Sequence, residues 1–99
     1  GDGTVDITVD PAVPGRNDVH IYVFDETGAL DDAYTEASVQ LSLPADDVGP
    51  LDREPVSAGP GHFLLVGTDL PLAGEWELTL TVKPDRFSEE SATVSFPVR

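Results

Sequence analysis

The sequence predicts an all-β fold, an immunoglobulin-like β-sandwich of about seven antiparallel strands. Two observations favour it: apolar and polar residues alternate over short runs, and clusters of Gly, Pro and Asp interrupt these runs about every ten residues. A third is that no window shows a sustained apolar stripe with the period of a helix. The 99 residues suit one domain, so we expect residues 1–99 to form a single sandwich.

Each alternating run predicts one strand. Residues 19–24 are apolar on both faces, which favours a central strand of a sheet. Residues 75–83 show the cleanest alternation and include Trp76, which we expect in the core. Residues 44–61 are rich in Pro and Gly and predict an irregular stretch, and Phe87 is expected to close one end of the core. The expected strands are Val5–Val9, Val19–Phe24, Ala37–Leu43, Glu54–Ser57, His62–Val66, Glu75–Lys83 and Val94–Val98.

The charge of the chain limits its partners. It carries 19 acidic and 5 basic residues, a formal net charge of −14. Such a surface repels phosphates, so we expect no nucleic acid partner and no anionic lipid surface. It suits cations, basic partners or high solubility.

The residue types also limit the chemistry. There is no Cys, and therefore no disulfide or thiolate, and there is no Met. A Gly-x-Ser-x-Gly elbow and a phosphate-binding loop are both missing, so we expect no enzyme. The acidic pairs do not follow the spacing of a calcium loop and are expected to be charged loop tips. These pairs are Asp25-Glu26, Asp31-Asp32, Asp46-Asp47 and Glu89-Glu90.

The two histidines are the candidate metal ligands. His20 and His62 fall in strands that a sandwich can place side by side. Imidazole nitrogen suits Cu(II) and Zn(II), and Asp18 is the nearby acid that would complete the site. In the alternative, His20 hydrogen-bonds loop backbone at an end of the sandwich and His62 orients the turn at residues 59–61.

The strand at residues 19–24 offers a candidate docking face. If Val19, Ile21 and Val23 point into the core, then His20, Tyr22 and Phe24 form an aromatic stripe on the surface. In the opposite register these three rings are core residues. Periodicity alone leaves both registers open, because both faces are apolar.

Four segments carry a resemblance to a known family. They are Pro14–Tyr22, Leu43-Pro44 with Gly49-Pro50-Leu51, Gly61-His62-Phe63, and Leu70–Trp76. Their order resembles the extracytoplasmic C-terminal domain of bacterial, especially actinobacterial, copper-resistance membrane proteins of the CopC/CopD type. It is more loosely similar to the YtkA-like and FixH-like sandwich domains. The most specific parts are the Gly-x-Asn-x-Val-His start of one strand and the Leu-Pro-x-Ala-Gly-x-Trp hairpin.

This resemblance implies a place and a role. The place is the periplasm or the cell surface, with the domain excised from a longer membrane protein and tethered through that parent. The role is that of a noncatalytic accessory domain in copper resistance or copper transport. It would dock onto the membrane-embedded part of its parent or onto another protein, or handle copper. The alternative function is a structural spacer or adhesion-like cell-surface module with no metal role.

Overall fold

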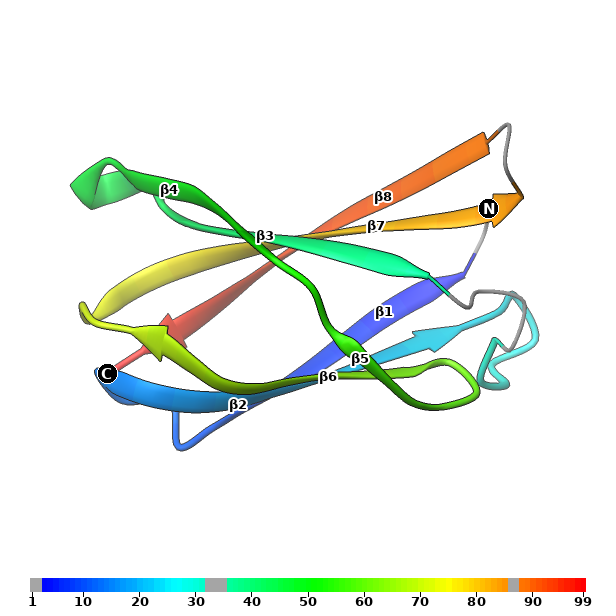
Figure 1. Cartoon of the computed structure of the whole chain (residues 1–99), viewed down its shortest axis with the longest axis horizontal. Helices are drawn as coiled ribbons and strands as arrows, with labels where there is room; N and C mark the ends of the chain where they lie inside the picture. Colours follow the sequence, from blue (N-terminus) through cyan, green and yellow to red (C-terminus); the bar gives the residue numbers. More distant parts are fainter. Residues whose placement is uncertain (1–2, 32–35, 86–87) are drawn as a thin grey trace.

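The protein folds as a sandwich of two antiparallel sheets (Figure 1). The computed structural model describes residues 3–31, 36–85 and 88–99, and these residues contain eight strands and one short 3-10 turn. This confirms the predicted fold class, with one strand more than expected. The elements are β1 (Thr4–Asp10), β2 (Gly15–Phe24), β3 (Ala37–Leu43), η1 (Pro44–Asp46), β4 (Val48–Arg53), β5 (Val56–Gly59), β6 (His62–Leu70), β7 (Gly74–Asp85) and β8 (Ser88–Val98).

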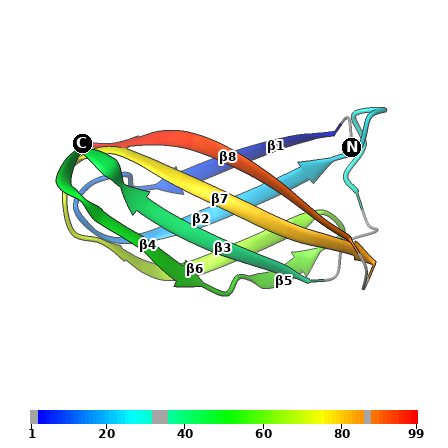
Figure 2. The same cartoon turned by 90° about the horizontal axis from the view of Figure 1, so that it is seen from above.

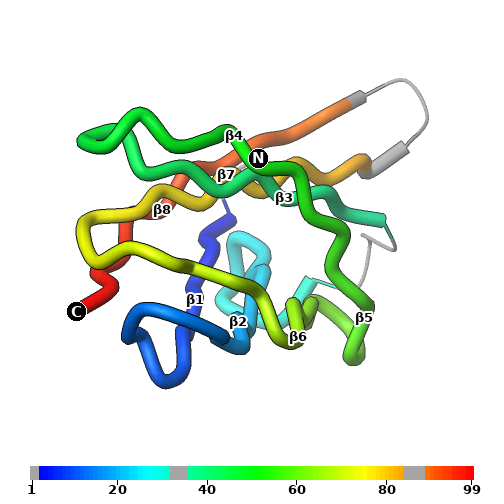
Figure 3. Tube along the Cα trace, turned by 60° about the vertical axis from the view of Figure 1, so that its left-hand side comes forward, coloured from blue at the N-terminus to red at the C-terminus, as the bar shows by residue number. Residues whose placement is uncertain are grey.

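Each sheet has four strands. One runs in the order β1-β2-β6-β5 and the other in the order β4-β3-β7-β8. Figure 3 shows the two layers one above the other, and Figure 2 shows their strands crossing at an angle, as twisted sheets do when they stack. β2 lies between β1 and β6, so the strand that is apolar on both faces is a central one, as predicted.

The core lies between the sheets and follows the alternation of the strands. Val19, Ile21 and Val23 point inward, which settles the register of β2 and leaves His20, Tyr22 and Phe24 half-buried on the outer side. Trp76 is fully buried, as expected, and its indole Nε1 donates to the carbonyl oxygen of Leu72 at 2.9 Å. The buried apolar residues are Val19, Ile21, Val23, Val39, Leu41, Leu43, Phe63, Leu65, Leu70, Trp76, Leu78, Leu80, Val82, Phe96 and Val98.

Three expectations differ from the structure, and Phe87 lies outside the described residues. Glu89 and Glu90 lie in strand β8 and not at a loop tip. The stretch at residues 44–61 holds a full strand, β4, that its prolines and glycines concealed. Because β4 is an edge strand, Pro50 can sit in it without removing a bond from a central ladder. The segment Leu70–Trp76 is not a hairpin, because β6 and β7 belong to different sheets.

Asn17 closes the loop between β1 and β2. Its Oδ1 accepts from the Ala12 N–H at 2.7 Å, and its Nδ2 donates to the carbonyl oxygens of Val13 and Gly15, both at 3.0 Å. The side chain is buried, so these hydrogen bonds replace those that it would make with water.

Within the described ranges, no helix has the length and apolar content that crossing a bilayer requires.

Candidate functional site

Three rings gather on the outer face of the β1-β2-β6-β5 sheet. Tyr22 on β2 lies directly opposite His62 on β6, and His20 lies one row away, opposite Leu64. The Tyr22 and His62 rings are stacked, with centroids 4.5 Å apart and planes inclined by 11°. The centroids of His20 and His62 are 5.5 Å apart. Cross-strand neighbours and diagonal pairs of this kind are within reach of aromatic side chains.

The two histidines are hydrogen-bonded to each other. Nδ1 of His20 lies 3.3 Å from Nε2 of His62, across 42 residues of sequence. One of these nitrogens must carry a hydrogen and the other must be bare, because a bond between two acceptors or two donors cannot form. The partner of His20 is therefore a second imidazole ring. This differs from the alternative in which it bonds loop backbone.

Asp18 is on the same face but has a different partner. Its Oδ1 accepts from the Gly67 N–H at 2.9 Å, at the irregularity in the pairing of β2 with β6. Across residues 3–31, 36–85 and 88–99, no three acidic or histidine side chains come close enough together to hold a metal ion. The structure thus brings His20 and His62 together and does not add Asp18 to them.

Backbone geometry holds His62 in place. Gly61 has a positive φ of 64°, and its carbonyl oxygen accepts from the Val23 N–H at 2.8 Å. A Cβ at this position would lie 2.7 Å from the carbonyl oxygen of Val23 and 2.8 Å from the amide of Asp31. Only glycine fits this close approach, so it sets where β6 begins and where the imidazole of His62 stands.

Aliphatic side chains extend the ring cluster. Val56 and Val66 are 58% and 62% exposed, and Leu64, paired with Val56, is half-buried on the same face. Periodicity alone did not predict that these three residues belong to an exposed surface. The signal was present in the run His62–Val66, which is apolar on both faces in the same way as residues 19–24. We call His20, Tyr22, Val56, His62, Leu64 and Val66 the β2–β6 face.

The outer face of the second sheet is of a different kind. Its side chains are mostly hydroxyls and carboxylates, and facing hydroxyls pair across β7 and β8. The Oγ1 atoms of Thr79 and Thr93 are 3.0 Å apart, as are the hydroxyl oxygens of Thr81 and Ser91. This is the solvated face that an antiparallel sheet normally presents, so the β2–β6 face is the exception within one molecule.

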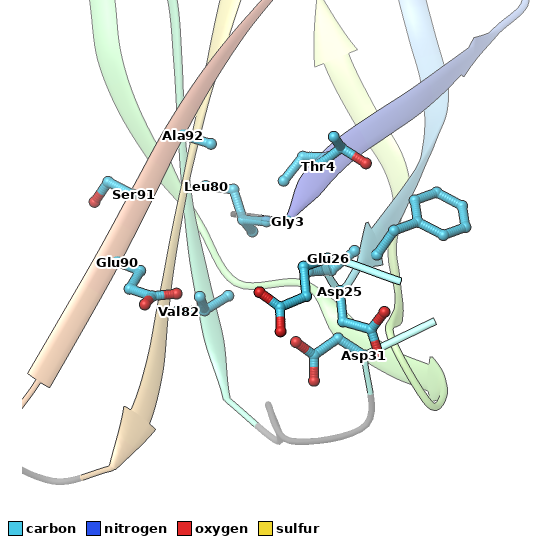
Figure 4. Close-up of a pocket in the computed structure, with 13 residues that line it drawn as sticks. Gly3, Thr4, Asp25, Glu26, Asp31, Leu80, Val82, Glu90, Ser91 and Ala92 are labelled. Carbon is cyan, nitrogen blue, oxygen red and sulfur yellow. The ribbon is translucent and has the colours of Figure 1, made fainter. Parts of the chain in front are cut away.

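A pocket of about 320 Å³ opens between the edges of β1 and β8. Figure 4 shows Asp25, Glu26 and Asp31 on one side of it and Glu90 on the other. Its floor is apolar and includes Val82. The Asp25 carboxylate is not free for a ligand, because it accepts from Thr27 Oγ1 at 2.6 Å and from the Thr27 N–H at 2.8 Å. These bonds hold the pKa of Asp25 below its usual value.

No family model, no curated protein and no solved structure matches the chain, so these comparisons assign it to no family.

Proposed function

We propose that the chain is a noncatalytic accessory domain of an extracytoplasmic copper-resistance or copper-transport membrane protein, and that it docks onto the membrane-embedded part of its parent. The copper context and the location rest on the resemblance of the Pro14–Tyr22 and Leu70–Trp76 segments to such domains. The docking role is supported by one observation, the contrast between the two outer faces. One is polar and hydroxyl-rich, and the other exposes rings and aliphatic side chains.

The chemistry of the β2–β6 face indicates what kind of surface it binds. Its centre is apolar, and burying exposed aliphatic carbon contributes about 25 cal/mol for each Å² removed from water. Its rim on β1 and β2 carries Asp6, Asp10 and Asp18, which point outward beside the rings. The complementary partner is therefore a protein surface with an apolar centre and basic residues around it.

Site-specific cross-linking in the full-length parent, in its own membrane, tests the docking. A photoreactive amino acid replaces Val66 on the β2–β6 face or, as the matched control, Thr93 on the opposite face. Both positions are exposed and lie outside the core, so both variants should fold. We expect cross-links to the membrane-embedded part from position 66 and none from position 93, with a chelator present throughout.

The second arm uses Val66→Glu, which places a charge at the apolar centre. This change should abolish the cross-link from a photoreactive residue at position 56 and leave the stability of the domain within about 0.5 kcal/mol. Equal cross-linking from both faces would contradict the proposal. Cross-linking from neither face would also contradict it and favour the spacer function.

A further inference from the structure

Tyr22 has a carboxylate as its cross-strand neighbour on β1. In the register of β1 with β2, Asp6 lies directly opposite Tyr22, and both side chains are on the outer side of the sheet. Asp6 is exposed and Tyr22 is half-buried. Residues directly opposite each other in an antiparallel pair have Cβ atoms about 4.5–5.5 Å apart, so one ligand can contact both side chains.

One face of the Tyr22 ring has no aromatic neighbour. The His62 ring stacks on Tyr22 with centroids 4.5 Å apart, and the centroid of His20 is 6.4 Å from that of Tyr22. Because the two imidazoles are only 5.5 Å from each other, both lie to the same side of Tyr22. No other ring of the described residues contacts Tyr22, and this includes Phe24, the next outward residue on β2. A flat group can therefore extend the stack of rings on the second face of Tyr22.

The carboxylate of Asp6 has no cation beside it in the described part of the chain. Within residues 3–31, 36–85 and 88–99 it makes no hydrogen bond and no ion pair. Arg16 is on the same outer face, but its guanidinium packs against Gly67. Lys83 is on the other sheet, beside Glu89. Asp6 is thus available to a cation from another molecule.

We propose that Tyr22 and Asp6 together bind an arginine side chain of the docked partner. The guanidinium group is planar, carries five N–H donors and is attracted to the face of an aromatic ring. It stacks on the second face of Tyr22 and donates two parallel hydrogen bonds to the carboxylate of Asp6. A lysine ammonium is a compact charge that makes neither the flat stack nor the forked pair of bonds.

The arginine site deepens the proposed docking and rests on it, because the arginine belongs to the basic residues expected around the apolar centre of the partner. The net charge of −14 raises the concentration of any cation near the surface and does not distinguish one cation from another. A ring face beside a carboxylate does distinguish them, since only a planar cation with forked donors uses both groups. Binding of arginine by this chain can be measured without the partner.

NMR titration of the chain with N-acetyl-arginine amide tests the site. N-acetyl-lysine amide is the matched probe, because it carries the same charge on a side chain of similar length. We expect saturable shifts in the amide signals of Asp6 and Tyr22 with the arginine probe. Binding of the lysine probe should be weaker by about fivefold or more.

Two substitutions remove the two halves of the site. Tyr22→Leu removes the ring and Asp6→Asn removes the charge, and each should weaken binding of the arginine probe by about fivefold or more. Asp10→Asn is the matched control, because Asp10 is exposed on the same face of β1. It lies about 13 Å further along the strand, beyond the screening length of about 10 Å in 0.1 M salt, so the affinity should change by less than about twofold. Thermal melting checks that all three variants are folded.

Three outcomes would overturn the arginine site. They are equal affinities for the two probes, equal losses in Asp6→Asn and Asp10→Asn, and the absence of saturable shifts in the wild type. The first two would show that the probe responds to net charge alone. If cross-linking from position 66 persists without arginine binding, the β2–β6 face docks without this arginine. If arginine binds and no cross-link forms, the docking is contradicted and the arginine site is retained.

Discussion

At the scale of single residues, the structure shows which contacts the residues of the Gly-x-Asn-x-Val-His segment make. Asn17 and His20 belong to the same Gly-x-Asn-x-Val-His segment but act on opposite faces of the sheet. Asn17 points inward and satisfies three backbone groups of the preceding loop. His20 points outward and meets His62. Within this segment, Asn17 therefore stabilises the fold, whereas His20 places an imidazole on the surface.

Asn17→Ala should be clearly destabilising. The change removes the bonds to Ala12, Val13 and Gly15, and a buried backbone group left without a partner costs about 1–3 kcal/mol. Urea unfolding measures the loss. Ser95→Ala, at an exposed position on β8, should change the free energy of unfolding by less than about 0.5 kcal/mol. Equal stability of the two variants would mean that Asn17 does not hold the loop.

At the scale of elements, β2 and its flanking turn organise the surface. The turn after β2 spans residues 25–29, where the Asp25 N–H donates to the carbonyl oxygen of Ala29 at 2.8 Å. The Asp25 side chain accepts from Thr27 Oγ1, from the Thr27 N–H and from the Ala29 N–H at 3.2 Å. This short polar network joins β2 to the isolated bridge between Phe24 and Leu30.

Asp25 should make stability depend on pH in a defined direction. Its pKa lies below the ordinary value of 3.8, chiefly because Thr27 Oγ1 and the Thr27 N–H donate to the carboxylate. The stabilisation is therefore fully present above pH 3.8 and is lost as the pH falls through the lower pKa of the folded state.

Asp25→Ala removes this dependence. The difference in unfolding free energy between wild type and Asp25→Ala should be largest at neutral pH and should shrink in acid. Thr27→Ala is the companion variant, because it removes the largest cause of the lowered pKa. A difference that stays constant across the pH range would show that the charge of Asp25 does not matter to the turn.

At the scale of the whole molecule, the excess of acid opposes the compact state. The formal net charge is −14, and an ion pair such as Lys83–Glu89, at 3.8 Å and exposed on both sides, contributes only about 0–1 kcal/mol. The hydrophobic core must therefore offset repulsion spread over the surface.

Added salt should stabilise the protein. Ions shorten the range of charge interactions to about 10 Å at 0.1 M and to about 3 Å at 1 M, which weakens the repulsion between carboxylates. We expect Tm to rise with NaCl, and each 1 kcal/mol gained raises Tm by about 4–8 °C in a domain of this size.

A charge-reduced variant is the control for the salt experiment. Glu26→Gln, Glu54→Gln and Glu75→Gln together change exposed positions and remove three negative charges. The triple variant should melt higher than wild type in low salt and respond less to NaCl. A Tm that does not change with salt, or that falls, would contradict the idea that surface repulsion limits stability.

The inward residues of the central strands could be predicted from the sequence, because a sheet with one solvated face must alternate. Trp76, Leu78, Leu80 and Val82 show this clearly, and all four are buried. The inward residues of β2 could not be predicted in this way, because both faces of the strand are apolar. Its register depended on whether Val19 or His20 met the opposite sheet. That choice belongs to packing and has no local signal.

The fold class, the approximate strand positions and the two candidate histidines followed from the sequence by itself. Only the tertiary structure decided that β2 lies beside β6, and therefore that His20 and His62 are hydrogen-bonded, that Tyr22 stacks on one of them, and that Asp18 turns to Gly67. The physical reason is the distance along the chain over which each interaction acts. Alternation of apolar and polar residues depends on neighbouring residues, whereas the pairing of β2 with β6, which brings together residues 42 positions apart, depends on how the strands pack to bury their apolar faces.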